Sequence, residues 1–81
     1  MIRLSEIQNL ICEVIANELH ISPSEIIDDV SFHDLGLDSV NSIFLISEIE
    51  NKLSIDIDPM SVYDNPTIKS FSKYLISLLN E

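Results

Sequence analysis

Apolar residues recur at helical spacing in three separate segments of the chain. The first segment reaches from about Glu6 to Leu19, the second begins at Ser39, and the third follows Thr67. A spacing of three or four residues places such side chains on one face of a helix. With 81 residues, the chain has room for one domain and one simple core. We therefore expect a single all-α domain over residues 1–81, with three main helices and one short helix.

Local start signals precede the expected helices. They are Ser5 with Gln8, Ser22 to Glu25, Asp38, Asp58 with Pro59, and Thr67. In three of them, a residue that caps a helix N-terminus is followed by a proline, glutamate or glutamine in the first turn. Asp38 and Thr67 are good caps on their own. The second signal predicts one short turn, and the fourth a very short helix through about Tyr63. The brief alternation at Ile55 and Ile57 is interpreted as loop.

A long connection containing Asp28 to Asp38 joins the first two main helices. Connections of this length are uncommon in compact domains and tend to be functional. Its apolar residues should hold it against the helices; they are Ile26, Ile27, Val30, Phe32, Leu35 and Leu37.

The second helix should have one face in the core and one in water. The expected core stripe is Leu45, Ile46, Ile49 and Leu53. The expected water-facing residues are Glu48, Glu50, Asn51 and Lys52.

The charge of the chain is strongly negative. Fourteen acidic residues oppose four basic ones, for a net charge of −10. Ten carboxylates and no Lys or Arg lie between Leu4 and Asn51. Nucleic acid and anionic membranes are poor partners for such a surface, because both require basic residues. A protein partner with a basic or mixed surface fits better, although the acidity could also serve solubility alone.

Cys12 is the only cysteine, so no internal disulfide forms. Inside a helical pattern we expect it to be a small buried apolar residue with no metal or nucleophilic role.

The N-terminus lacks the pattern of a secretory signal, and no apolar stretch is long enough to span a membrane. We therefore expect a cytoplasmic monomer.

Ser39 differs from the other serines in its surroundings. Of twelve serines, it alone directly follows an Asp; it also follows the loop that contains Gly36, and it opens a helix. The N-terminus of a helix offers free backbone N–H groups and a positive dipole end, which favour a phosphate ester. Capping alone would also explain an Asp-Ser step, because both residues are common there.

The stretch Leu35-Gly36-Leu37-Asp38-Ser39-Val40 resembles the attachment motif of acyl carrier proteins, Leu-Gly-x-Asp-Ser followed by an aliphatic residue. The resemblance covers nearly the whole chain. It implies that a phosphopantetheinyl transferase attaches 4'-phosphopantetheine from coenzyme A to Ser39, whose new arm then carries acyl groups as thioesters. It also implies that Asp38 helps at the transferase step, and that the chain is not itself an enzyme. Acyl-loading, condensing or modifying enzymes would be the other partners.

A second stretch, Val62-Tyr63-Asp64-Asn65-Pro66-Thr67-Ile68, resembles a segment of carriers from polyketide and nonribosomal peptide systems. Together with Asp38, this similarity implies a free-standing carrier in polyketide-like metabolism, with fatty-acid synthesis second. An aminoacyl or peptidyl carrier, including one for D-alanyl transfer, stays open. A different class also stays open: a non-covalent acidic helical adaptor that docks through the second helix.

The second helix departs from the family pattern at three positions. Val40 replaces the commoner Leu, Phe44 stands where Glu is usual, and Asn51 where an acidic residue is frequent. Val40 and Phe44 lie four residues apart on one helix face, largely off the core stripe and close to Ser39. We expect both to contact partner proteins; the alternative is that Phe44 packs at the edge of the core.

The loop also contains residue types that occur in two other kinds of site. His33 lies six residues before Ser39 and could act as its general base, but no third, orienting group is evident. Four aspartates could suggest calcium: Asp28, Asp29, Asp34 and Asp38. No register of the sequence meets the spacing of an EF-hand loop, so no metal site is predicted.

Overall fold

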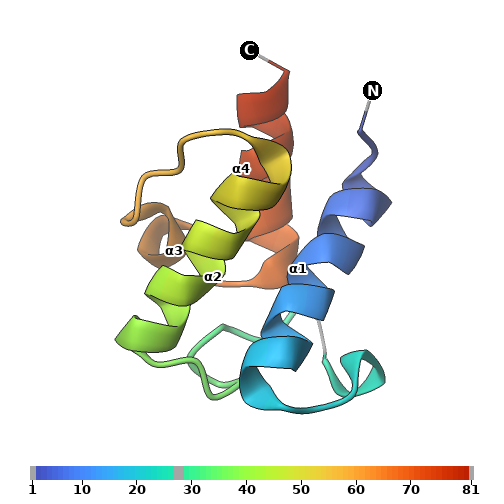
Figure 1. The fold of residues 1–81 in the computed structure, drawn as a ribbon, viewed down its shortest axis with the longest axis vertical. Coiled ribbons are helices and arrows are strands. Elements are labelled where there is room, and N and C mark those ends of the chain that lie inside the picture. The colour runs from blue at the N-terminus through green and yellow to red at the C-terminus, as the bar shows by residue number, and fades with distance from the viewer. Residues whose placement is uncertain (1, 27–28, 81) are drawn as a thin grey trace.

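Four helices and one 3₁₀ turn make up the part of the chain that the computed structural model describes, residues 2–26 and 29–80 (Figure 1). They are α1 (Leu4–Leu19), η1 (Pro23–Glu25), α2 (Ser39–Leu53), α3 (Ser61–Asp64) and α4 (Ile68–Leu79). Within these residues the only β pairing is an isolated bridge between Ser31 and Thr67. The expected all-α architecture is confirmed. None of the described helices has the length and apolarity needed to cross a bilayer.

The core forms where α1 packs against both α2 and α4. Its most deeply buried side chains are largely aliphatic: Ile7, Ile11, Ile15, Leu45, Ile49, Ile68, Phe71 and Leu75. The stripe predicted for α2 is confirmed at Leu45, Ile46 and Ile49, whereas Leu53 is only partly buried. Cys12 was expected to be buried and is instead partly exposed at the edge of the core.

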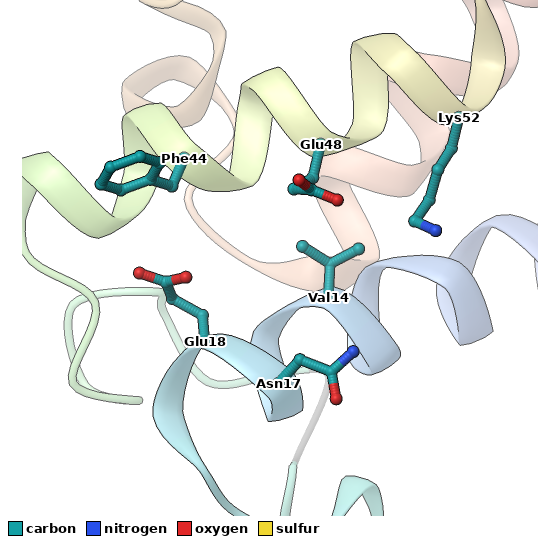
Figure 2. Close-up of a pocket in the computed structure, with 6 residues that line it drawn as sticks. All are labelled: Val14, Asn17, Glu18, Phe44, Glu48 and Lys52. Atoms are coloured by element: carbon teal, nitrogen blue, oxygen red, sulfur yellow. The ribbon is translucent and has the colours of Figure 1, made fainter.

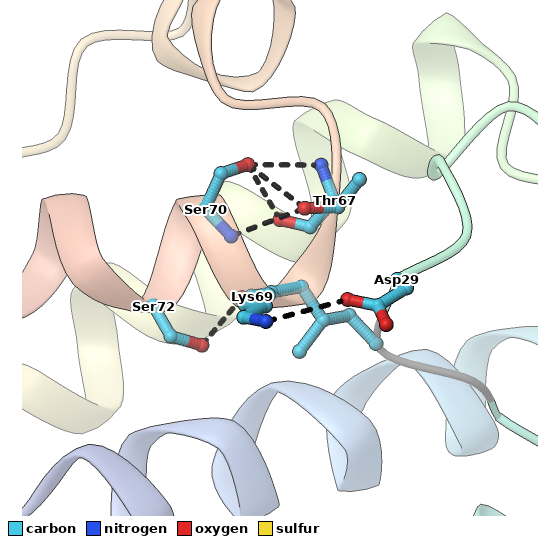
Figure 3. A network of polar contacts seen from close by, with 6 residues as sticks. Asp29, Thr67, Lys69, Ser70 and Ser72 are labelled. Atoms are coloured by element: carbon cyan, nitrogen blue, oxygen red, sulfur yellow. Dashed lines mark hydrogen bonds and ion pairs between the residues drawn. The ribbon is translucent and has the colours of Figure 1, made fainter.

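The predicted starts of α2 and α4 are confirmed by reciprocal caps. Asn41 donates its backbone N–H to Asp38 Oδ1 at 2.8 Å, and Asp38 donates its own to Asn41 Oδ1 at 3.4 Å. Thr67 and Ser70 exchange the same kind of contact, at 3.1 and 3.2 Å (Figure 3). Ser22 also caps η1 as expected, with Glu25 accepting from its N–H at 2.9 Å. These contacts satisfy amides that have no partner inside the helix.

Two predicted N-terminal caps are wrong, at Ser5 and at Asp58. Helix α1 begins at Leu4, because the Glu6 carboxylate accepts the Arg3 N–H at 3.1 Å; Ser5 lies inside the helix. Helix α3 begins at Ser61 and not at Pro59. There Asp58 and Pro59 form a turn before the helix, in which the Asp58 carboxylate accepts the Met60 N–H at 2.9 Å.

Glu50 was expected to face water and is partly buried instead. Its carboxylate accepts the backbone N–H of Ile57 at 2.8 Å, and the Ile57 side chain is buried. This contact fastens the loop after α2 onto the helix that precedes it. The interpretation of Ile55 and Ile57 as loop is confirmed.

The loop before α2 is attached to the start of α4. Phe32 donates its N–H to the Pro66 carbonyl at 2.7 Å, and its ring meets Phe71 edge-on, with centroids 5.7 Å apart. Phe32 and Leu37 are buried, while Ile26, Val30 and Leu35 are partly buried. The predicted anchor Ile27 and the residue Asp28 lie outside the described residues. An exposed ion pair between Lys69 and Asp29, at 3.8 Å, contributes little here (Figure 3).

Candidate functional site

Ser39 is the first residue of α2 and its side chain is exposed. Two residues earlier, Leu37 is buried in the core, so the chain is fixed just before the helix starts. The turn ahead of Leu37 uses Gly36 at φ +99°, a left-handed conformation that other residues rarely adopt. The loop thus carries the Ser39 hydroxyl to the surface at the helix N-terminus.

The backbone around Ser39 favours a negatively charged substituent. The N–H of Asn41 is bonded to the Asp38 carboxylate and that of Ser42 to the Asp38 carbonyl. In the described part of the chain, the N–H groups of Ser39 and Val40 make no hydrogen bond within the protein. These two amides and the positive end of the helix dipole lie where a phosphate on Ser39 would be attached. A phosphate ester fits this position.

Two hollows meet at Ser39. The loop-side groove, of about 210 Å³, is lined by the buried residues Leu37 and Val62 and by more exposed residues, which we call its rim: Ser31, His33, Asp38, Tyr63 and Pro66. The apolar hollow, of about 190 Å³, is lined by Ile43 and Ile46 of α2 and by Pro59 and Met60. Ser39, Ser42, Val62 and Tyr63 line both. A group attached to Ser39 could therefore enter either of the two hollows.

Val40 and Phe44 are 58% and 55% exposed, so neither belongs to the core. Three more large apolar side chains near Ser39 are also exposed: Ile43, Met60 and Tyr63. No charged residue lies between Asp38 and Glu48 in the sequence. We call these five exposed residues the apolar face. The sequence did not lead us to Met60 and Tyr63 as part of this face, although two large apolar residues at and just before so short a helix were a usable signal.

Phe44 also borders a hollow of about 320 Å³ between α1 and α2 (Figure 2). Glu48 and Lys52 follow Phe44 along α2, while Val14 and Glu18 of α1 lie on the other side. The Glu18 carboxylate accepts a hydrogen bond from the Asn41 side-chain amide at 2.8 Å. Carboxylates thus lie beside the apolar face on its α1 side.

The remaining candidates lie close to the site without forming a second one. His33 is exposed and lines the loop-side groove with Ser39, but no hydrogen bond joins their side chains in the described structure. The described residues also hold no cluster of three or more His, Cys, Asp or Glu side chains suited to a metal ion. Asp28, one of the four loop aspartates that could suggest calcium, is outside them.

Comparison with known proteins gives one consistent family. Residues 9–75 match the family model described as "Phosphopantetheine attachment site". The chain is 37% identical over 62 residues to the non-reducing polyketide synthase albA of Aspergillus niger, an alignment that covers 76% of the chain and 3% of the synthase. The chain is therefore similar to one small part of a very large enzyme.

Solved carrier structures share the whole fold. A free-standing peptidyl carrier protein from an uncharacterized Acinetobacter baumannii secondary metabolic pathway superposes with a TM-score of 0.89 at 28% identity, covering 94% of this chain and 95% of that one. The HMG-ACPI domain from the CurA module of Lyngbya majuscula gives 0.87 at 32% identity, covering 95% and 78%. Members of the matched family carry 4'-phosphopantetheine covalently on a serine. The chain belongs to this phosphopantetheine-attachment family and is a carrier protein domain.

Proposed function

We propose that Ser39 is the serine that receives 4'-phosphopantetheine and that the thiol of the arm carries acyl intermediates as thioesters. The main observation is the position of Ser39: an exposed hydroxyl at the first position of α2, beside two amides without a partner in the described protein. Among the serines, it alone combines an Asp before it with a helix N-terminus. Asp38 would assist the transferase step, in addition to capping the helix.

The domain itself carries out no chemistry in this proposal. A phosphopantetheinyl transferase supplies the arm, and separate enzymes load, condense or modify the acyl group. His33 is left without a catalytic role. The whole of residues 1–81 then serves as one carrier unit that presents Ser39 to each enzyme in turn.

We place the carrier in polyketide-type synthesis. The similarity to a polyketide synthase supports this assignment, as does the similarity to PksL, a polyketide synthase of Bacillus subtilis. The likeness to a peptidyl carrier favours a second candidate, an aminoacyl or peptidyl carrier, because the same fold serves both. A malonyl transferase should load the arm-bearing protein; loading only by an amino-acid-activating enzyme would contradict the polyketide assignment.

Partner enzymes would dock on the apolar face, with Val40 and Phe44 at the side nearest α1. Five exposed large apolar side chains around one attachment point need a reason, and contact with a partner is one. The acidic residues that flank this face include Asp38, Glu18 and Glu48. A partner with an apolar centre and a basic or mixed rim would match both features.

Incubation with coenzyme A and a broad-specificity phosphopantetheinyl transferase tests the carrier function. The intact mass should rise by one phosphopantetheine group, and a sample without transferase should stay unchanged. No gain in mass with active transferase would contradict the proposal and favour an adaptor without a covalent arm.

A further inference from the structure

The loop-side groove begins at Ser39 and has both polar and apolar residues in its lining. We propose that this groove is the resting site of the pantetheine part of the arm, an inference that depends on the proposed attachment at Ser39. The arm would thus lie against His33 and Pro66 when no partner enzyme is bound.

The arm would be joined covalently to a residue of the groove. Ser39 itself lines the groove, so an arm attached to it begins inside the proposed site. A tethered group has a high effective concentration at any surface that its tether can reach. Contacts far too weak to hold a free ligand are then sufficient to populate one resting position.

The fold holds the walls of the groove in place. Phe32 donates to the Pro66 carbonyl at 2.7 Å, and Leu37 donates to the Phe32 carbonyl at 3.0 Å. Ser31 pairs with Thr67 in the isolated bridge. These contacts tie the rim residues of the loop to the segment before α4. A groove formed in advance costs little ordering when a ligand enters it.

The lining of the groove suits the chemical groups of pantetheine. Pantetheine combines amide groups and a hydroxyl with a pair of geminal methyl groups. Leu37 and Val62 offer it an apolar floor. At the rim, Ser31 Oγ accepts the Asp34 N–H at 3.1 Å, which leaves its own proton to donate, and the exposed His33 ring can both donate and accept when neutral. The groove therefore offers both hydrogen-bonding and apolar contacts, as pantetheine requires.

The apolar hollow is less suited to the pantetheine part of the arm. Beyond the residues that both hollows share, the apolar hollow is lined by Ile43, Ile46, Pro59 and Met60. Amide groups placed there would find hydrogen-bonding side chains only among the shared residues, such as Ser42 and Tyr63, and would otherwise lose water against apolar side chains, which is unfavourable. The amides should therefore turn toward the loop.

The test uses the intact 81-residue protein carrying an isotope-labelled arm, attached by a transferase from labelled coenzyme A. Intact mass confirms attachment first. Nuclear Overhauser effects from the geminal methyl protons of the arm should then reach Leu37, Pro66 and the His33 ring. Effects only to Ile43 or Met60, or none beyond Ser39 and its neighbours, would overturn the proposal.

Matched variants sharpen the result. His33→Ala should weaken the contacts to Pro66 by about threefold, the scale of one hydrogen bond, whereas Met60→Ala, in the other hollow, should leave them unchanged. Equal effects of both variants would also overturn the proposal. If the mass shows no arm, the proposed function fails as well; if the arm is attached but lies elsewhere, only the resting site fails.

Discussion

Phe44 is an aromatic side chain that folding leaves more than half exposed. The periodicity of α2 predicted this, because Phe44 falls largely off the stripe formed by Leu45, Ile46 and Ile49. Its ring lies at the edge of a hollow that Glu18 and Glu48 also line (Figure 2), and no residue of the Phe32–Leu37 loop lines that hollow. The residue can therefore serve binding without serving the core.

Phe44→Ala should barely change the melting temperature while lowering kcat/KM with a partner enzyme, for which the transferase serves as probe. Little buried surface is lost at an exposed site. Ile49→Ala is the matched control on the same helix: Ile49 is fully buried, and its truncation should cost about 2–5 kcal/mol of folding stability. A large fall in melting temperature for Phe44→Ala would identify the ring as packing and refute the docking role.

Residue-level prediction from the sequence was correct where one helix determines the outcome and failed where two segments meet. Val40 and Phe44 were placed on the exposed side by helical spacing alone. Glu50 was misplaced because its partner, the Ile57 N–H, comes from a loop that no periodicity describes. Tyr63 lines both hollows, and this too could not be predicted, because it depends on how α3 lies against α2.

At the level of elements, the start of α2 combines capping and chemistry in one residue. The Asp38 carboxylate caps the helix through Asn41, and the same side chain lies next to the proposed attachment hydroxyl. Substitutions at Asp38 affect both roles, so two different replacements are needed to separate them.

Asp38→Ala should lower the free energy of unfolding by about 1 kcal/mol, the usual effect of losing an N-cap. Asp38→Asn should keep the stability, because Asn caps equally well. If the carboxylate itself assists arm transfer, Asp38→Asn should still slow the transferase step, by about tenfold for the loss of ~1.4 kcal/mol of transition-state stabilisation. Initial rates measured by mass spectrometry decide this; a wild-type rate for Asp38→Asn would limit Asp38 to capping.

The starts of α2 and α4 were predictable because the expected capping side chains do make the caps. These side chains are those of Asp38 and Thr67, and α2 and α4 begin where they predict. Helix α1 starts earlier because its first contact uses the backbone of Arg3, which carries no sequence signal of its own. Asp58 and Pro59 signal a turn as readily as a helix start, and here they form the turn.

At the scale of the whole molecule, negative charge is spread over the fold with little compensation. Lys69 and Asp29 form an exposed ion pair, and no other is found between charged side chains of the described residues. The net charge is −10, so mutual repulsion acts against the compact state.

The melting temperature should therefore rise with salt. Between about 0.01 M and 0.15 M, the Debye length falls from ~30 Å to ~8 Å, which screens most of the repulsion between distant carboxylates. Thermal unfolding followed by circular dichroism measures this effect, and a low concentration of Mg²⁺ should act in the same direction. A melting temperature that stays flat or falls over this range would contradict the account.

The whole-molecule arrangement was the least predictable part. Helical spacing indicated an all-α domain, but not that α1 would contact both α2 and α4. The loop-side groove brings Ser31 and His33 together with Tyr63 and Pro66, about thirty residues further along the chain. Such contacts depend on tertiary packing, which no local pattern in this sequence encodes.

The most direct measurement for the central claim compares Ser39→Ala with Ser42→Ala after incubation with coenzyme A and transferase. Ser42 lines both hollows in the first turn of the same helix, so it is a close control for everything except the attachment position. Both variants should fold, since Asp38 still caps α2. The account predicts that Ser42→Ala gains one phosphopantetheine group and that Ser39→Ala gains none; an arm on Ser39→Ala would show that the site lies elsewhere.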